Sequence, residues 1–221
     1  MELQKQLNLQ RNEQDHIWGH LQADRWYTTQ KYAGHEVLDV GCANGIYVQE
    51  LLNMGHKVIG VDLLPYDEWS YLPNTIVLSD ARNLPFADNS FDTIISFETL
   101  EHVPDPETAL AEYHRICTKN IIISVPNCDL PDIMSHSGLT FYHYIDRTHV
   151  NFFTPTSLKE MVENQGFKVQ EIRPFNAVLP ASAFLATLGI PTKYARKLGQ
   201  WLNLISPKKY YMSLLLVASK V

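Results

Sequence analysis

Short apolar runs alternate with helix-like stretches along the first two thirds of the chain. Five runs have the length of strands, and they span 36–41, 57–62, 75–80, 91–97 and 120–125. Apolar positions at helical spacing separate them over 46–54 and 107–115. Because the strand-like runs are apolar on both faces, we expect a parallel sheet that helices cover on both sides.

The last third of the chain has a different pattern. Thr154 and Pro155 are typical of a helix start, and this amphipathic segment ends before Gly166. Strand-like runs follow at 167–173 and 210–220, with an apolar insert at 177–208 between them. The whole pattern predicts an α/β fold: a Rossmann-like, doubly wound, seven-stranded sheet, parallel except for an antiparallel edge strand.

The 221 residues are enough for one domain with a sizeable core. We expect an N-terminal helical cap at 1–33, a cofactor-binding core at 34–173, the insert at 177–208 and the edge strand at 210–220. The insert contains two helix-like pieces, which Gly189 and Pro191 separate.

Charge and cysteine content restrict the partners and the compartment. The formal net charge is −6, so no general basic field attracts nucleic acid, which we therefore disfavour as a partner. The three cysteines are odd in number and match no zinc spacing, which favours reduced thiols in the cytoplasm. The polar start predicts no secretory signal, and prolines in the longest uncharged run predict no transmembrane helix.

The first predicted strand leads into a glycine-rich turn. Gly41, Ala43 and Gly45 allow a tight bend and the close approach of a ligand. Asp39 lies two residues before this turn, where its carboxylate would repel a pyrophosphate but accept hydrogen bonds from an ammonium group. This favours a cofactor with a cationic amino-acid part over a dinucleotide.

Two further carboxylates end the next strands. Asp62 can accept both hydroxyls of a ribose, and Asp80 can accept from the amino group of adenine. A single Asp at such a position is often only a cap or turn residue. Three of them at successive strand ends favour one nucleoside site at the carboxyl edge of the sheet.

Four segments in this order resemble class I S-adenosylmethionine (SAM)-dependent methyltransferases of the group that acts on small molecules, similar to quinone-biosynthesis O-methyltransferases. They are 37–45, 58–62, 79–86 and 91–105. The resemblance implies that the Asp39–Gly45 loop, with Cys42, cradles the methionine part of SAM and that Asp62 binds the ribose. It also implies contacts of Asp80 and Ala81 with adenine and of Phe97 with the methionyl tail. We add Leu63 and Arg82 to the candidate cofactor site; Ala43 departs from the glycine often found there.

The implied reaction is an in-line SN2 transfer of a methyl group, with an oxygen of a small molecule as the favoured acceptor. Two other classes remain open. The chain could bind SAM as a regulatory or pseudo-enzyme subunit of a partner protein. A nicotinamide dehydrogenase is disfavoured by Asp39 and by the missing third glycine.

Candidate catalytic residues follow the fourth and fifth predicted strands. If residues 98–102 are helical, Glu98, Glu101 and His102 share one face, and His149 can reach the same rim. Three interpretations stand: these residues pack and line the pocket, one histidine is a general base, or the four bind a divalent metal. Quinone-biosynthesis enzymes carry Glu-x-x-Glu-His here, and small-RNA 2′-O-methyltransferases add a later histidine. A metal-dependent RNA 2′-O-methyltransferase is therefore a further alternative.

Aromatic residues lie near these candidates in the sequence, and two interpretations are open: they enclose a flat or apolar acceptor, or about half of them belong to the core. The aromatic residues near the histidines are Phe141, Tyr142, Tyr144, Phe152 and Phe153. The insert at 177–208 is interpreted as a lid, as a docking surface for a membrane with a lipid-linked acceptor, as a dimer face or as core. The chain is expected to be a monomer or a homodimer.

Overall fold

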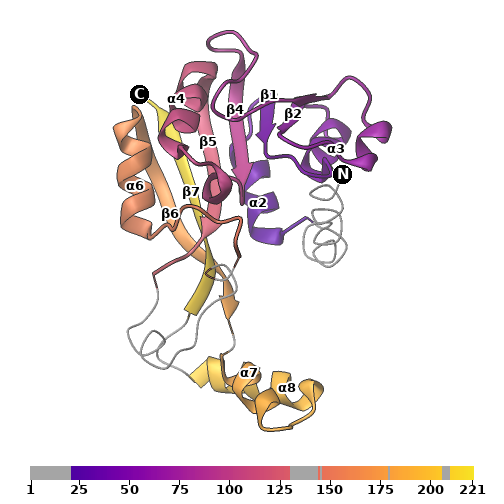
Figure 1. Cartoon of the computed structure of the whole chain (residues 1–221), viewed down its shortest axis with the longest axis vertical. Helices are drawn as coiled ribbons and strands as arrows, with labels where there is room; N and C mark the ends of the chain where they lie inside the picture. Colours follow the sequence, from indigo (N-terminus) through magenta and orange to yellow (C-terminus); the bar gives the residue numbers. More distant parts are fainter. Residues whose placement is uncertain (1–20, 130–143, 145, 179, 206–209) are drawn as a thin grey trace.

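The computed structural model describes residues 21–129, 144, 146–178, 180–205 and 210–221, and its sheet has seven strands in the order β3-β2-β1-β4-β5-β7-β6 (Figure 1). The first five strands are parallel, and β7 is antiparallel to both of its neighbours. The strands are β1 (Glu36–Val40), β2 (Lys57–Asp62), β3 (Ile76–Leu78), β4 (Phe91–Phe97), β5 (Cys117–Pro126), β6 (Phe167–Val178) and β7 (Tyr210–Lys220). The predicted fold class is confirmed, but the expectation that 210–220 is the edge strand is wrong: β7 pairs with both β5 and β6, and β6 forms the edge.

Helices cover both faces of the sheet (Figure 1). The helical elements are α2 (Ala23–Tyr32), α3 (Ile46–Asn53), η1 (Asp67–Tyr71), η2 (Leu100–His102), α4 (Pro106–Ile116), α6 (Pro155–Asn164), α7 (Pro180–Thr187) and α8 (Thr192–Ile205). Successive strand residues point to opposite faces, so Ile94 packs with α4 and α6 while Ile95 packs with α2 and α3. The expected helix at 1–33 is described only from residue 21, and its earlier part lies outside the described residues.

Local sequence explains where α4 and α6 begin. The Asp105 side chain accepts a hydrogen bond from Thr108 N–H, and proline follows it at the first helical position. Thr154 and Ser157 cap α6 reciprocally, since each side chain accepts from the backbone N–H of the other. These caps set the entry of both helices that cover one face of the sheet.

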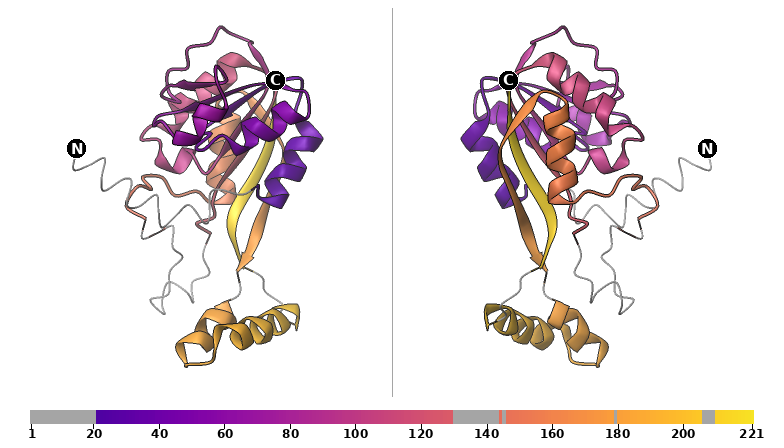
Figure 2. Two further views of the ribbon diagram at one scale, coloured as in Figure 1. Left: turned by 90° about the vertical axis from the view of Figure 1, so that its right-hand side faces the viewer. Right: turned by 90° about the vertical axis from the view of Figure 1, so that its left-hand side faces the viewer.

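Strands β6 and β7 form a ribbon that is longer than the sequence predicts. β6 continues to Val178, five residues beyond the expected end at 173, because Pro174 lies on the edge strand, where proline is tolerated. Pro126 at the end of β5 pairs with Ser213, whereas the ribbon continues to the pair Val178 and Tyr210. Figure 2 shows α7 and α8 at the tip of this ribbon, away from the sheet.

Candidate active site

The turn after β1 has three residues in the left-handed region of the backbone. Gly41 and Gly45 have φ angles of 77° and 82°, and Ala43 has φ 46°. A Cβ atom on Gly41 would lie 2.1 Å from Oγ1 of Thr99, so the turn and the end of β4 are in direct contact. The glycines therefore allow the backbone to pass close to the neighbouring strand and leave its edge open to a ligand.

Asp62 and Trp69 hold this turn from the outside. The Asp62 carboxylate accepts hydrogen bonds from Ala43 N–H at 2.9 Å and from Leu64 N–H at 3.1 Å. The Trp69 indole N–H donates to the Ala43 carbonyl at 2.7 Å. Trp69 lies in the short helix η1, and no sequence motif marks it.

Asp39 is a buried carboxylate without a full set of partners. Asp39 is 2% exposed, and its Oδ2 atom has no hydrogen-bond partner among the described residues. Burial, together with the nearby charge of Asp62, raises the pKa of Asp39 to about 8. A buried polar atom of this kind needs a donor, and a ligand ammonium group has the matching chemistry.

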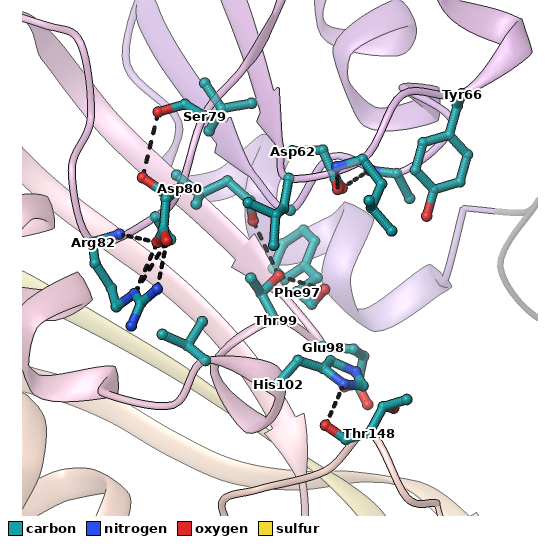
Figure 3. Close-up of a pocket in the computed structure, with 18 of the residues that line it drawn as sticks. Asp62, Tyr66, Ser79, Asp80, Arg82, Phe97, Glu98, Thr99, His102 and Thr148 are labelled. Carbon is teal, nitrogen blue, oxygen red and sulfur yellow. Dashed lines mark hydrogen bonds and ion pairs between the residues drawn. The ribbon is translucent and has the colours of Figure 1, made fainter. Parts of the chain in front are cut away.

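The third strand end carries an ion pair. Arg82 Nη2 lies 2.6 Å from Oδ2 of Asp80, and the Arg82 guanidinium lowers the pKa of that carboxyl. Ser79 and Ala81, which flank Asp80, line with it a cavity at the carboxyl edge of the sheet. Figure 3 shows Asp80 and Arg82 on one side of this cavity, with Asp62 and Phe97 across from them.

A single cavity of about 410 Å³ connects these groups. It is lined by eight of the residues expected to bind the cofactor: Gly41, Ala43, Asp62, Leu63, Asp80, Ala81, Arg82 and Phe97. Asp39, Cys42 and Gly45 lie behind this lining and are not part of it. Figure 3 shows Glu98, His102 and Thr148 at the other end of the cavity, and Thr99 and Asp146 also line it. Asp62, Asp80 and His102 therefore face one continuous space.

Glu98 does not share a helical face with Glu101 and His102. Its φ angle is 50°, and only Leu100–His102 turn helically, as the 3-10 helix η2. The Glu98 carboxylate forms an ion pair with Arg25 of α2 and accepts a hydrogen bond from Ser124 at 3.2 Å. The helical arrangement expected for these residues is thus corrected, because the chain leaves β4 in a left-handed turn.

Glu101, His102 and His149 come together as a compact cluster. Each offers a ligand atom, and these atoms lie within 4.8 Å of one another. The two imidazole rings are 4.7 Å apart, and burial together with His149 lowers the pKa of His102. Glu101 is 1% exposed, and neither carboxylate oxygen has a hydrogen-bond partner among the described residues, although Oε1 lies 4.0 Å from Nε2 of His102. Burial raises the pKa of Glu101 well above its usual range.

Asn151 and Thr148 connect the two segments that carry the histidines. The Asn151 side-chain amide donates to the carbonyls of Leu100 and Val103, at 2.9 and 2.6 Å. The carbonyl of Thr148 accepts a hydrogen bond from Nδ1 of His102 at 3.2 Å. The position of this segment at the rim was predicted, but Asn151 was not, because its contacts are with backbone atoms of a segment distant in sequence.

The aromatic residues near the histidines have different environments. Tyr144 and Phe152 stack with ring centroids 5.5 Å apart, whereas Phe153 is buried in the core. Phe141 and Tyr142 lie outside the described residues. Among the described residues, none of these aromatics and no residue of 177–208 lines the cavity.

The cavity lies at the carboxyl ends of the parallel strands, and a family comparison identifies the class of enzyme. The family profile for "Methyltransferase domain" matches residues 11–172. The chain therefore belongs to this methyltransferase family, and it is a class I SAM-dependent methyltransferase. Its cofactor is SAM, for which the unpartnered Asp39 carboxylate and the open turn at Gly41 provide fitting chemistry.

The chain is similar to two curated relatives and to a solved structure. It is 30% identical to the ubiquinone biosynthesis O-methyltransferase of Psychrobacter arcticus, over 70% of this chain and 67% of the relative. It is 28% identical to the malonyl-(acyl-carrier protein) O-methyltransferase of Yersinia pestis, over 57% and 48%. The 1,6-didemethyltoxoflavin-N1-methyltransferase of Burkholderia thailandensis, solved with S-adenosylhomocysteine, superposes with a TM-score of 0.66 at 18% identity. That superposition covers 99% of this chain and 87% of the other.

Proposed function

We propose that this enzyme transfers the methyl group of SAM to an oxygen atom of a small-molecule acceptor, by in-line SN2 displacement. The observation that carries the proposal is the continuous cavity, which Asp62 lines at one end and His102 at the other. SAM supplies a methyl group that its sulfonium already activates, so the protein's main task is to align the acceptor. The O-methyltransferase names of the two curated relatives support oxygen as the acceptor atom.

The proposed cofactor contacts follow from the positions of the carboxylates. Asp39 would accept hydrogen bonds from the ammonium group, and Asp62 from the ribose hydroxyls. Asp80 and Ala81 would contact the adenine at the third strand end, with Arg82 keeping Asp80 ionised through their ion pair. Phe97, with the Asp39–Gly45 loop, would enclose the methionine part.

His102 is the proposed general base for a hydroxyl acceptor. A carbonyl oxygen can only accept, so the hydrogen bond to Thr148 places the proton on Nδ1 and leaves Nε2 as the basic atom. The lowered pKa keeps the ring neutral at pH 7. In this role Nε2 takes the hydroxyl proton while the acceptor oxygen attacks the methyl group.

Our second proposal is that the cluster of Glu101, His102 and His149 binds a divalent metal. Glu101, His102 and His149 offer one carboxylate and two imidazole ligands at suitable mutual distances. A bound cation would also give the unpartnered Glu101 oxygens a partner. Glu98, which pairs with Arg25, lies outside this set. Titration with Mg²⁺, Mn²⁺ and Zn²⁺ of the wild type and of His149→Ala tests the site.

The proposed compartment is the cytoplasm. Cys42, Cys117 and Cys128 are free thiols, which fits a reducing environment. No helix among the described residues is long and apolar enough to cross a membrane.

The test is the formation of S-adenosylhomocysteine with a panel of acceptors, namely phenols, catechols, carboxylic acids, primary amines and short RNA ending in a 2′-hydroxyl. We expect turnover with a hydroxyl compound and its loss in His102→Asn, while the exposed control Glu160→Gln retains it. Turnover with the amines alone would contradict oxygen as the acceptor. SAM binding without turnover on the whole panel would favour the regulatory-subunit alternative, and turnover of RNA alone would favour the RNA alternative.

A further inference from the structure

The α7–α8 hairpin, residues 180–205, projects from the enzyme. Figures 1 and 2 show it in all three views beyond the end of the sheet, at the tip of the β6–β7 ribbon. The ribbon passes the carboxyl end of β5, since the pair Ala177 and Tyr211 lies outside the pair Pro126 and Ser213. The hairpin is therefore on the side of the sheet where the carboxyl ends of the parallel strands form the cavity.

One face of α8 is apolar and open to solvent. Tyr194, Leu198, Trp201 and Ile205 follow one another at spacings of four, three and four residues, so they share a helix face. Their exposed fractions are 61%, 42%, 55% and 62%. A different face packs on α7, because Gly199 is buried and a Cβ atom there would lie 2.9 Å from Cβ of Ser182. The exposed face is therefore not the one that joins the two helices.

The charge of this part of the chain is opposite in sign to that of the remainder. Residues 174–221 contain six of the 18 Lys and Arg residues and none of the 24 Asp and Glu residues. Three of these cations, Lys193, Arg196 and Lys197, lie on α8 and are exposed. An amphipathic helix with an aromatic, apolar face and basic residues beside it matches a surface of anionic lipid.

We propose that the α7–α8 hairpin docks the enzyme on the surface of a bilayer that contains anionic lipid, with the apolar face of α8 in the interface. A second copy fits this face less well, because two hairpins face to face would bring six exposed cations together. Neither helix is long and apolar enough to cross the membrane, so the hairpin lies on it.

Docking would turn the cavity side of the sheet toward the bilayer. If the proposed function holds, this orientation suits an acceptor that is dissolved in lipid or tethered to it. The docking itself requires no methyl transfer, so a vesicle-binding measurement tests it independently of the proposed reaction.

The experiment is flotation of the full chain with vesicles of phosphatidylcholine alone and with phosphatidylglycerol added. We expect binding only with phosphatidylglycerol, and weaker binding as salt increases. Replacing Lys193, Arg196 and Lys197 by Ala should lower the partition coefficient about 100-fold, because each cation contributes a factor of about five. Trp201→Ser should lower it about tenfold.

Matched control residues lie on the surface of the methyltransferase domain, outside the hairpin. Tyr27 of α2 is 66% exposed, and Lys57, Lys159 and Lys168 are exposed lysines outside the hairpin. Tyr27→Ser and the triple change of these lysines to Ala should both bind vesicles as the wild type does. The proposal is overturned if no vesicles bind, if the controls and the hairpin variants lose binding equally, or if Trp201→Ser instead dissociates a dimer in light scattering.

Discussion

The carbonyl oxygen of Thr148 accepts a hydrogen bond from Nδ1 of His102, at 3.2 Å. This contact selects the tautomer whose Nε2 is free of a proton, and burial lowers the pKa of the ring. The backbone of a segment more than forty residues away in sequence thus prepares the proposed base.

The first prediction concerns His102→Asn, in which the side-chain amide can still donate to Thr148. We expect the rate constant of methyl transfer to fall about 100-fold or more, since a general base contributes this much. The dissociation constant of SAM should change less than about twofold, because no proposed SAM contact is lost. Single-turnover kinetics and calorimetry separate the two quantities. Equal losses in rate and SAM affinity would contradict the assignment.

The second prediction is the pH dependence of the same step. Because the pKa of His102 is below the ordinary 6.5, the ring is neutral above that pH. The rate should therefore be constant from about pH 7 upward with respect to this group, and it should decrease only in more acidic solution. A rate that increases tenfold per pH unit between 7 and 9, and does so in His102→Asn as well, would assign the proton transfer to another group.

The third prediction is that Asp39 lowers stability in the absence of cofactor. Its folded pKa of about 8 lies above the 3.8 of an ordinary Asp, so the folded protein binds a proton that the unfolded chain releases. The stabilisation of the folded state by this bound proton is fully present below about pH 4 and is lost as the pH rises to about 8. Asp39→Asn should accordingly raise the free energy of unfolding, and the increase should be about 3 kcal/mol larger at pH 7.5 than at pH 5.

The same substitution should weaken SAM binding, because an amide cannot pair with the ammonium group as a carboxylate does. Urea unfolding at both pH values and calorimetric titration measure the two effects. Glu160→Gln, at an exposed position on α6, is the control for loss of one carboxylate. A less stable Asp39→Asn protein at pH 7.5 would contradict the account of Asp39.

Part of the cavity lining could be predicted from the sequence because its signals are local. Asp62 and Asp80 lie at or just after the ends of adjacent parallel strands, so both carboxylates lie at a common edge of the sheet and line the cavity, whereas Asp39 is buried behind the lining. Eight of the eleven residues expected to bind the cofactor line the cavity. The roles of the individual side chains in binding and catalysis stay predictions.

The fourth prediction compares two glycines with similar backbone angles. Gly41 and Gly55 have φ 77° and 88°, but a Cβ atom meets Thr99 at 2.1 Å only at Gly41 and nothing within 4 Å at Gly55. Gly55→Ala should cost about 1 kcal/mol for its backbone angle. Gly41→Ala should cost about 2 kcal/mol more through the clash, and it should also weaken SAM binding. Equal unfolding free energies for the two variants would contradict the close approach of the turn to β4.

The fifth prediction concerns the ion pair of Arg25 and Glu98, whose side chains are 13% and 9% exposed. Arg25→Met leaves the Glu98 carboxylate buried without its cation and should destabilise the fold by about 3 kcal/mol. The double variant with Glu98→Gln should recover at least half of this loss. Thermal or urea unfolding of the single and double variants gives the coupling, and purely additive effects would contradict it.

Contacts between distant segments account for what the sequence did not predict. Arg25 lies in a polar N-terminal stretch with no motif, yet it stacks over Phe97 and Phe175 and pairs with Glu98. Spacing along the sequence grouped Glu98 with Glu101. In the folded chain, the packing of α2 on the sheet instead pairs Glu98 with Arg25. The length of the β6–β7 ribbon likewise depends on pairing across the strands rather than on either run by itself.

Calorimetric titration of SAM into the wild type and into Asp62→Ala tests the central claim most directly. The account predicts saturable one-site binding by the wild type and a loss of at least about tenfold in affinity in Asp62→Ala, which removes a charged hydrogen-bond acceptor. Glu160→Gln should bind as the wild type does. Absence of binding to the folded wild type, or equal affinity in Asp62→Ala, would contradict the assignment of this cavity to SAM.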